Sequence, residues 1–245
     1  MSGVGLRRSI MTKRKNILDN SITVLKLDIK ELTRMVENQY NQVIEAIMKN
    51  DSKIALEVIE NDQEINELAE DIDLETLIVI ARYQPVASDL RRVMTINKLA
   101  YELERIADYA KSIARYVITG HEKNVIEGPS IITNFEQMFH TIFEMLETNL
   151  KAFENEDKEL ARQALLMDQK IDDAYKENFE TLLARFKEEK RDDVQHMISM
   201  ALILNKQIER AGDHLTNISE QILYLIKGKR YYVDEFIEKR WDILL

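Results

Sequence analysis

The chain has 245 residues, 45% of them hydrophobic, with a formal net charge of −10 and no cysteine. That hydrophobic fraction excludes a disordered chain, and the missing thiols exclude disulfides, zinc–thiolate centres, iron–sulfur clusters and thiol catalysis. Basic residues gather only near the start of the chain and lead into no helix-turn-helix pattern. Since neutralised phosphates supply most of the affinity of nucleic-acid binders, we predict no direct contact with nucleic acid.

Glycine and proline are scarce, with 6 and 2 residues in the chain, and apolar residues recur at helical spacing nearly throughout. Because these two residue types are the usual breakers of regular structure, the sequence predicts an all-α fold of long helices. In chain order, the predicted helices cover residues 17–49, 52–80, 86–118, 131–154, 157–189, 192–227 and a short stretch at 232–243. A linker is predicted at 120–129, and Gly228 stands where a C-terminal helix cap belongs.

The chain shows no signal for a membrane or for export. No apolar run approaches the roughly 18 to 20 residues needed to span a bilayer. No apolar segment follows the basic residues at the start, as it would in a secretory signal. The sequence therefore predicts a cytoplasmic protein.

Two motifs occur twice. Residues 104–108 (ERIAD) recur 105 positions later as 209–213 (ERAGD), and residues 62–65 (DQEI) recur 106 positions later as 168–171 (DQKI). The nearly equal offsets indicate a duplicated unit, and the fold is predicted as two tandem antiparallel three-helix bundles related by this duplication. The predicted segments are a basic N-terminal segment (1–16), a first repeat (17–120), a linker (121–130), a second repeat (131–228) and a helical C-terminal tail (229–245).

Each repeat carries a pair of carboxylates four residues apart, Glu104 with Asp108 and Glu209 with Asp213. On a helix such residues share a face, with side chains about 5 to 6 Å apart. On a helical wheel both pairs flank the apolar stripe. Two like charges at this spacing cost a few tenths of a kcal/mol in an isolated helix, so a compensating positive charge is expected.

Two sources of that charge stay open. Carboxylate oxygens suit hard cations such as Mg²⁺, Mn²⁺, Ca²⁺ and iron. The alternative is ordinary salt bridges to Arg105, Lys111 and Arg210. Spacing alone favours salt bridges, because acidic pairs on helices are common, whereas the recurrence of the pair in both repeats strengthens the metal interpretation.

Gly212 and His214, which flank Asp213 of the second pair, each lead to a prediction. Gly212 precedes Asp213, and a glycine inside a helix costs about 1 kcal/mol relative to alanine, so we expect another helix to approach closely there. The first repeat has Ala107 in the same place, which indicates that small size is what matters. His214 invites a ligand role, but a salt-bridged or exposed histidine is the more ordinary expectation.

Three segments together resemble the PhoU family of phosphate-signalling proteins: residues 84–91 (QPVASDLR), 103–110 (LERIADYA) and 208–214 (IERAGDH). The match covers about residues 17 to 228 and both repeats in order. The resemblance implies two three-helix bundles side by side, with metal held on their outer surface. Carried onto this sequence, the metal residues are Glu104, Asp108, Glu209 and Asp213, with Glu102, Asp62 and Asp168 as weaker candidates. The implied cofactor is a divalent or trivalent metal ion, iron or zinc first, with Mg or Mn as alternatives.

The same resemblance implies a negative regulator of phosphate uptake and of the phosphate-starvation (Pho) response. Such a protein acts as an adaptor between the ATPase of the phosphate ABC transporter and a membrane sensor histidine kinase. It is expected to be a cytoplasmic homodimer that meets the membrane only through these partners and performs no chemical turnover. The alternative is a PhoU-like metal-binding helical scaffold that serves another transporter or signalling partner.

An enzyme of the di-iron carboxylate class is the main rival from a different class. That chemistry requires Glu-x-x-His pairs projecting into a four-helix bundle. None of the four histidines has a glutamate three residues before it. A P-loop, a Gly-rich dinucleotide turn and a G-x-S-x-G elbow are also missing, so we predict that the protein is not an enzyme.

Overall fold

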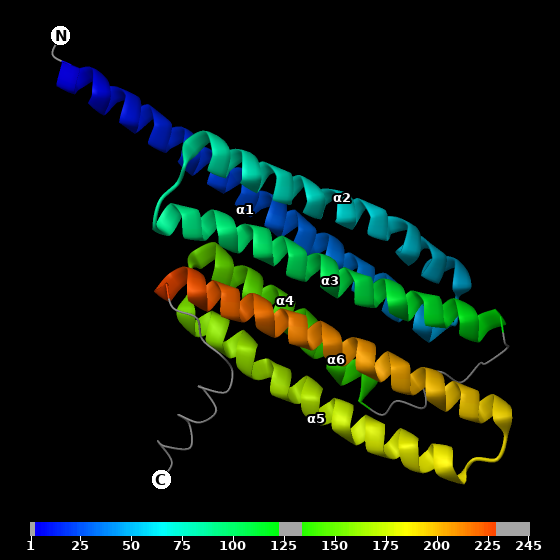
Figure 1. Cartoon of the computed structure of the whole chain (residues 1–245). Coiled ribbons are helices and arrows are strands. Elements are labelled where there is room, and N and C mark those ends of the chain that lie inside the picture. Colours follow the sequence, from blue (N-terminus) through cyan, green and yellow to red (C-terminus); the bar gives the residue numbers. More distant parts are fainter. Residues whose placement is uncertain (1–2, 123–133, 229–245) are drawn as a thin grey trace, which may run out of the picture.

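The computed structural model describes the backbone of residues 3–122 and 134–228, and the side chains of residues 15–120 and 134–228. All regular structure in these ranges is helical, which confirms the all-α prediction (Figure 1). The helices are α1 (Gly3–Lys49), α2 (Ser52–Tyr83), α3 (Ser88–Glu122), α4 (Phe135–Asn155), α5 (Lys158–Glu188) and α6 (Asp192–Lys227). No helix in the described ranges is long and apolar enough to cross a membrane.

Helix α1 begins at Gly3 instead of residue 17, so the helix runs on into the basic segment 1–16. This stretch contains no proline, and its lysines, arginines, leucine and methionine are good helix formers. Helix α3 starts at Ser88, two residues later than predicted, because Ala87 has φ 49° and lies in the left-handed region. The predicted tail helix at 232–243 lies outside the described residues.

The duplication extends to the helix caps. Asp51 and Asp157, 106 positions apart, each accept hydrogen bonds from two backbone N–H groups at the start of α2 and α5. The residue before each cap, Asn50 or Glu156, has positive φ, 48° and 49° respectively. A carboxylate cap stabilises a helix by about 1 kcal/mol. Both repeats therefore turn from their first helix into their second in the same way.

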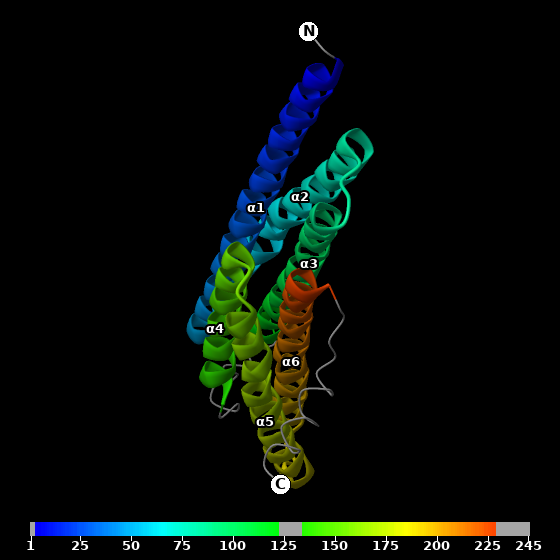
Figure 2. The same ribbon diagram turned by 90° about the vertical axis from the view of Figure 1, so that its left-hand side faces the viewer.

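The two bundles share one continuous hydrophobic core. Figures 1 and 2 show α2 and α5 on opposite outer sides of the molecule, with α3 and α6 side by side in the middle. Helix α1 also touches α4, where the rings of Tyr40 and Phe139 meet edge to face at 6.0 Å. The Tyr40 hydroxyl donates to the carbonyl of Ile106 at 3.1 Å. The fold is thus the predicted pair of three-helix bundles, joined into one body.

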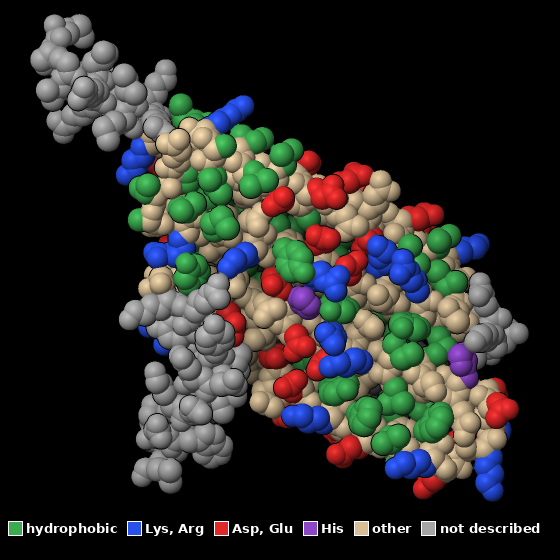
Figure 3. Space-filling view, in the orientation of Figure 1, with side chains coloured by type: hydrophobic (Ala, Val, Ile, Leu, Met, Phe, Trp, Pro, Cys, Tyr) green, Lys and Arg blue, Asp and Glu red, His purple; other side chains and the backbone are tan. Residues whose placement is uncertain are grey.

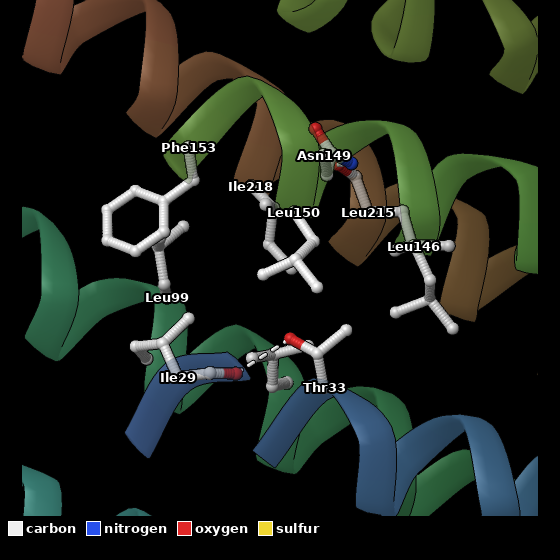
Figure 4. Close-up of a pocket in the computed structure, with 10 residues that line it drawn as sticks. Ile29, Thr33, Leu99, Leu146, Asn149, Leu150, Phe153, Leu215 and Ile218 are labelled. Carbon is white, nitrogen blue, oxygen red and sulfur yellow. Dashed lines mark hydrogen bonds between the residues drawn. The ribbon is translucent and has the colours of Figure 1, made fainter. Parts of the chain in front are cut away.

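The core where α1, α3, α4 and α6 meet contains only a small cavity of about 10 Å³ (Figure 4). That is room for roughly one water molecule at most. Its walls are mainly leucine, isoleucine and phenylalanine, and its two polar side chains have partners: Thr33 donates to the carbonyl of Ile29, and Asn149 to that of Leu215. At this point the interior between the repeats is closely packed.

Candidate metal site

The four predicted residues lie on two pairs of packed helices: Glu104 and Asp108 on α3, which packs on α2, and Glu209 and Asp213 on α6, which packs on α5. Glu104, Asp108 and Glu209 are partly buried at the edge of the core, and Asp213 is exposed. The helix before each motif helix adds acids to these pairs. Figure 3 shows acidic side chains gathered over α2 and α3 and again over α5 and α6 on one side of the molecule.

We call the cluster on α2 and α3 the first acid face. It consists of Asp62, Asn66, Glu104, Asp108 and Lys111. Asp62 is buried and accepts from Lys111 Nζ at 2.5 Å and from Asn66 Nδ2 at 3.2 Å. Lys111 Nζ also lies 3.9 Å from Asp108, which Arg105 contacts at 2.8 Å on its other side. The salt bridges expected from Arg105 and Lys111 are therefore present.

Burial acts on the remaining acid of this face. The pKa of Glu104 is raised above its ordinary value, first by burial and then by the neighbouring charge of Asp108. The nearby Arg105 guanidinium works in the opposite direction. Glu104 is thus the acid of the first face whose charge is least well compensated.

We call the cluster on α5 and α6 the second acid face. It consists of Asp168, Asp172, Glu209, Asp213 and Thr216. Burial and the charge of Asp172 raise the pKa of Asp168 to about 7. The pKa values of Asp172 and Asp213 are also raised, mainly by burial and then, for Asp213, by Glu209. The pKa values of Asp168, Asp172 and Asp213 are thus all raised by burial, and neighbouring carboxylates add to the rise, which marks a site where negative charge is poorly compensated.

The basic residue at this second face differs from the expected one. Lys206, one turn before Glu209, forms the ion pair with Glu209. Arg210 acts on Asp213 only through its charge, which offsets part of the rise in the pKa of Asp213. The lysine also lies over the ring of Tyr175, 5.2 Å from its centre.

Gly212 permits the close approach expected from the sequence. A Cβ atom at this position would lie 2.6 Å from Asp168 Oδ1 and 3.1 Å from a methyl group of Ile171. Asp168 therefore lies directly over the backbone of α6, in space that any side chain at 212 would occupy. In the first repeat, which has Ala107 at this place, the equivalent acid Asp62 is in contact with Lys111.

His214 points away from the acids of its own repeat. Its Nδ1 donates to the Glu102 carboxylate on α3 at 2.6 Å, and its Nε2 lies 3.2 Å from the Tyr109 hydroxyl. Asn217 donates to the same Glu102 oxygen at 3.1 Å. Glu102 and His214 thus join the two repeats, which agrees with the ordinary salt-bridged expectation for this histidine.

Within the described ranges, no three His, Asp or Glu side chains converge into a ready-made metal site. The second face nevertheless fits a hard cation chemically. It offers carboxylate oxygens. The buried Thr216 hydroxyl beside them has no hydrogen-bond partner of ordinary geometry. This hydroxyl lies near enough to Asp168 to offset part of the rise in the pKa of that carboxyl group. A bound ion would have to draw these carboxylates together.

Sequence reasoning missed Asp172, Lys206 and Thr216. Asp172 follows Asp168 by one helical turn, and the 106-residue offset places it opposite Asn66 of the first repeat. Both signals were available from the duplication. The role of Thr216 depends on its burial, which the repeat alone does not disclose.

The model of the PhoU domain matches residues 29–117 and 135–222, once in each repeat. The chain is 34% identical over 207 residues to the phosphate-specific transport system accessory protein PhoU of Escherichia coli, covering 84% of both chains. It is 32% identical over 241 residues to the protein of the same name from Serratia marcescens, covering 98% of this chain and 96% of that one. The crystal structure of PhoU from Pseudomonas aeruginosa superposes with a TM-score of 0.79 at 30% identity, covering 86% of this chain and 99% of that chain.

Proposed function

Because the chain belongs to the PhoU family, we propose that it is a regulatory accessory protein of phosphate transport and not an enzyme. In this role it represses phosphate uptake and the phosphate-starvation response when phosphate is sufficient. Its partners are the ATPase of a phosphate ABC transporter and a membrane sensor histidine kinase, and it works in the cytoplasm as a homodimer. The match of both repeats to the family, over nearly the full length of named relatives, carries this proposal.

The adaptor role suits the architecture. The two repeats form one body with a shared core, so their outer helices make a long, rigid surface on which two partners can be held at once. Phosphate status then decides which complex persists, and the coupling is a difference in binding free energy between two complexes. No chemical step is required of any side chain.

A metal ion adds to this surface on the α5–α6 side. Glu209 and Asp213, joined by Asp168 and Asp172, supply the ligands for a divalent or trivalent ion, with iron, zinc, manganese and magnesium as candidates. The ion neutralises the mutual repulsion of these carboxylates and ties α5 to α6. In the corresponding pair on the first face, Asp108 already has basic partners within the chain, Arg105 and Lys111.

Deletion of the gene tests the regulatory role. In phosphate-replete medium the deletion strain should show raised alkaline phosphatase activity and raised phosphate uptake, and the wild-type gene on a plasmid should restore both. Co-purification of a tagged chain should recover the transporter ATPase and the kinase. Unchanged phosphatase activity and uptake in the deletion strain would contradict the proposal.

A further inference from the structure

The two acid faces descend from one duplicated unit but differ at two positions. Asn66 of the first face corresponds to Asp172 of the second, at an offset of 106 residues. Lys111 of the first face corresponds to Thr216 of the second, at an offset of 105 residues. Among the five residues that define each face, the first face therefore has one acid fewer and one base more than the second.

On the first face, the ammonium group of Lys111 lies where a cation between the two helices would lie. Its Nζ is 2.5 Å from Asp62 on α2 and 3.9 Å from Asp108 on α3. Gln39 of α1 donates to Asp62 as well, at 3.1 Å. Asp62 is only 1% exposed, so its charge is compensated within the fold by groups that shield it from solvent.

On the second face, the position of the lysine is taken by a neutral side chain. Thr216 is 8% exposed, and its hydroxyl oxygen lacks a hydrogen-bond partner of ordinary geometry. It lies beside Asp168, which has Asp172 and Asp213 as further acidic neighbours. Lys206 pairs with Glu209 from a position 40% exposed to solvent.

We propose that Lys111 is a built-in cation that replaces metal on the first acid face, so that each chain binds metal on the second face alone. The inference rests on the metal binding proposed above. It narrows the set of four metal residues expected from the sequence, because Glu104 and Asp108 are acidic but are not ligands. A metal ion on the first face would have to displace the ammonium group from Asp62 or lie next to it, and like charges at such distances in a partly buried groove repel strongly.

The metal content of the wild type and of two double variants tests whether only the second face binds metal. The purified chain is incubated with Mn²⁺, Zn²⁺ or Fe²⁺ in parallel, desalted and analysed by inductively coupled plasma mass spectrometry. Glu104→Ala/Asp108→Ala should retain all of the wild-type metal, whereas Glu209→Ala/Asp213→Ala should lose it. Circular dichroism of each variant confirms that it is folded.

Exchange of the two differing residues provides the matched test. Thr216→Lys should abolish metal binding by placing an ammonium group in the second face. Asn66→Asp/Lys111→Thr, which gives the first face the residues of the second, should raise the metal content about twofold. Both variants keep every acid proposed as a ligand. A change in metal content would therefore result from the added or removed ammonium group and not from the loss of a ligand.

Two results would overturn the inference in different ways. If Glu104→Ala/Asp108→Ala loses half or more of the metal, both faces bind metal and the role of Lys111 is wrong, while metal binding by the protein stands. If the wild type retains no metal with any of the three ions, both the inference and the proposed metal are wrong. The phosphatase assay decides the regulatory role separately in either case.

Discussion

Asp62 and Asp168 hold the same position in the two repeats and experience opposite electrostatics. Asp62 is buried with an ammonium group and two amides as donors, whereas Asp168 is partly buried among other acids and has its pKa raised to about 7. A carboxylate whose pKa is raised on folding destabilises the folded state when it ionises. The two aspartates should therefore respond in opposite directions to the same substitution.

We predict that Asp168→Asn stabilises the metal-free protein and Asp62→Asn destabilises it. Asp62→Asn leaves Lys111 without its nearest partner, which should cost about 1 to 3 kcal/mol. Asp168→Asn removes a partly buried charge, and the gain should be of the order of 2 kcal/mol at pH 8 after allowance for partial solvation. Urea unfolding in the presence of a chelator measures both, and equal signs for the two variants would contradict the assignment.

The pH dependence of the metal-free protein follows from the same group. Between about pH 4 and 7 the unfolded chain has released the Asp168 proton while the folded chain still holds it, so stability falls as pH rises through this window. Above pH 7 the loss from this residue is complete. The stabilisation by Asp168→Asn should accordingly be small at pH 4 and largest at pH 8. A gain independent of pH would show that Asp168 titrates normally in the folded protein.

Gly212 links backbone packing to the same acid. In Gly212→Ala the new methyl group would displace the Asp168 carboxylate, whose Oδ1 lies 2.6 Å from the position of that Cβ. Since alanine favours the helix by about 1 kcal/mol, the net change in stability should stay within about 1 kcal/mol. Metal affinity, measured by calorimetric titration, should nevertheless fall at least tenfold. Unchanged affinity would place the metal away from Asp168.

Among the elements, the contact of α3 with α6 contains one of the polar links between the repeats. Glu102 accepts from both His214 and Asn217 across this contact, and it lies outside both acid faces. Glu102→Ala should lower the free energy of unfolding by about 1 to 2 kcal/mol and leave metal content unchanged. His214→Ala is the matched variant from the other side. Loss of metal in either variant would make Glu102 or His214 a ligand.

The helices themselves were largely predictable, because glycine and proline are scarce and the apolar stripes are regular. The predicted starts of α1, α3 and α4 were misplaced, the last because α4 begins at Phe135 and not at 131, and the first two have local reasons. For α1, the basic residues before residue 17 were interpreted as a separate segment, although charged residues continue a helix well. For α3, the left-handed backbone conformation of Ala87 cannot be recognised from the sequence. The acid pairs followed from helical spacing. The cation that compensates these acids could not be predicted in the same way, because Lys111 and Asp62 are brought together by the packing of α2 on α3.

At the scale of the whole molecule, the shared core predicts one cooperative unit. Apolar side chains of α3 and α6, and of α1 and α4, meet between the repeats without a break. An isolated second repeat, residues 134–228, would expose this surface to water at about 25 cal/mol per Å². The full chain should unfold in one transition by circular dichroism, and the fragment should be unfolded or self-associated. A fragment that is monomeric and melts cooperatively would show two independent domains.

Anomalous diffraction from crystals grown with Mn²⁺ or Zn²⁺ tests the unequal acid faces most directly. We expect strong peaks between α5 and α6, within coordination distance of Glu209 and Asp213, and Lys111 still in contact with Asp62. Peaks of similar height next to Glu104 and Asp108, with the Lys111 ammonium group displaced, would contradict it.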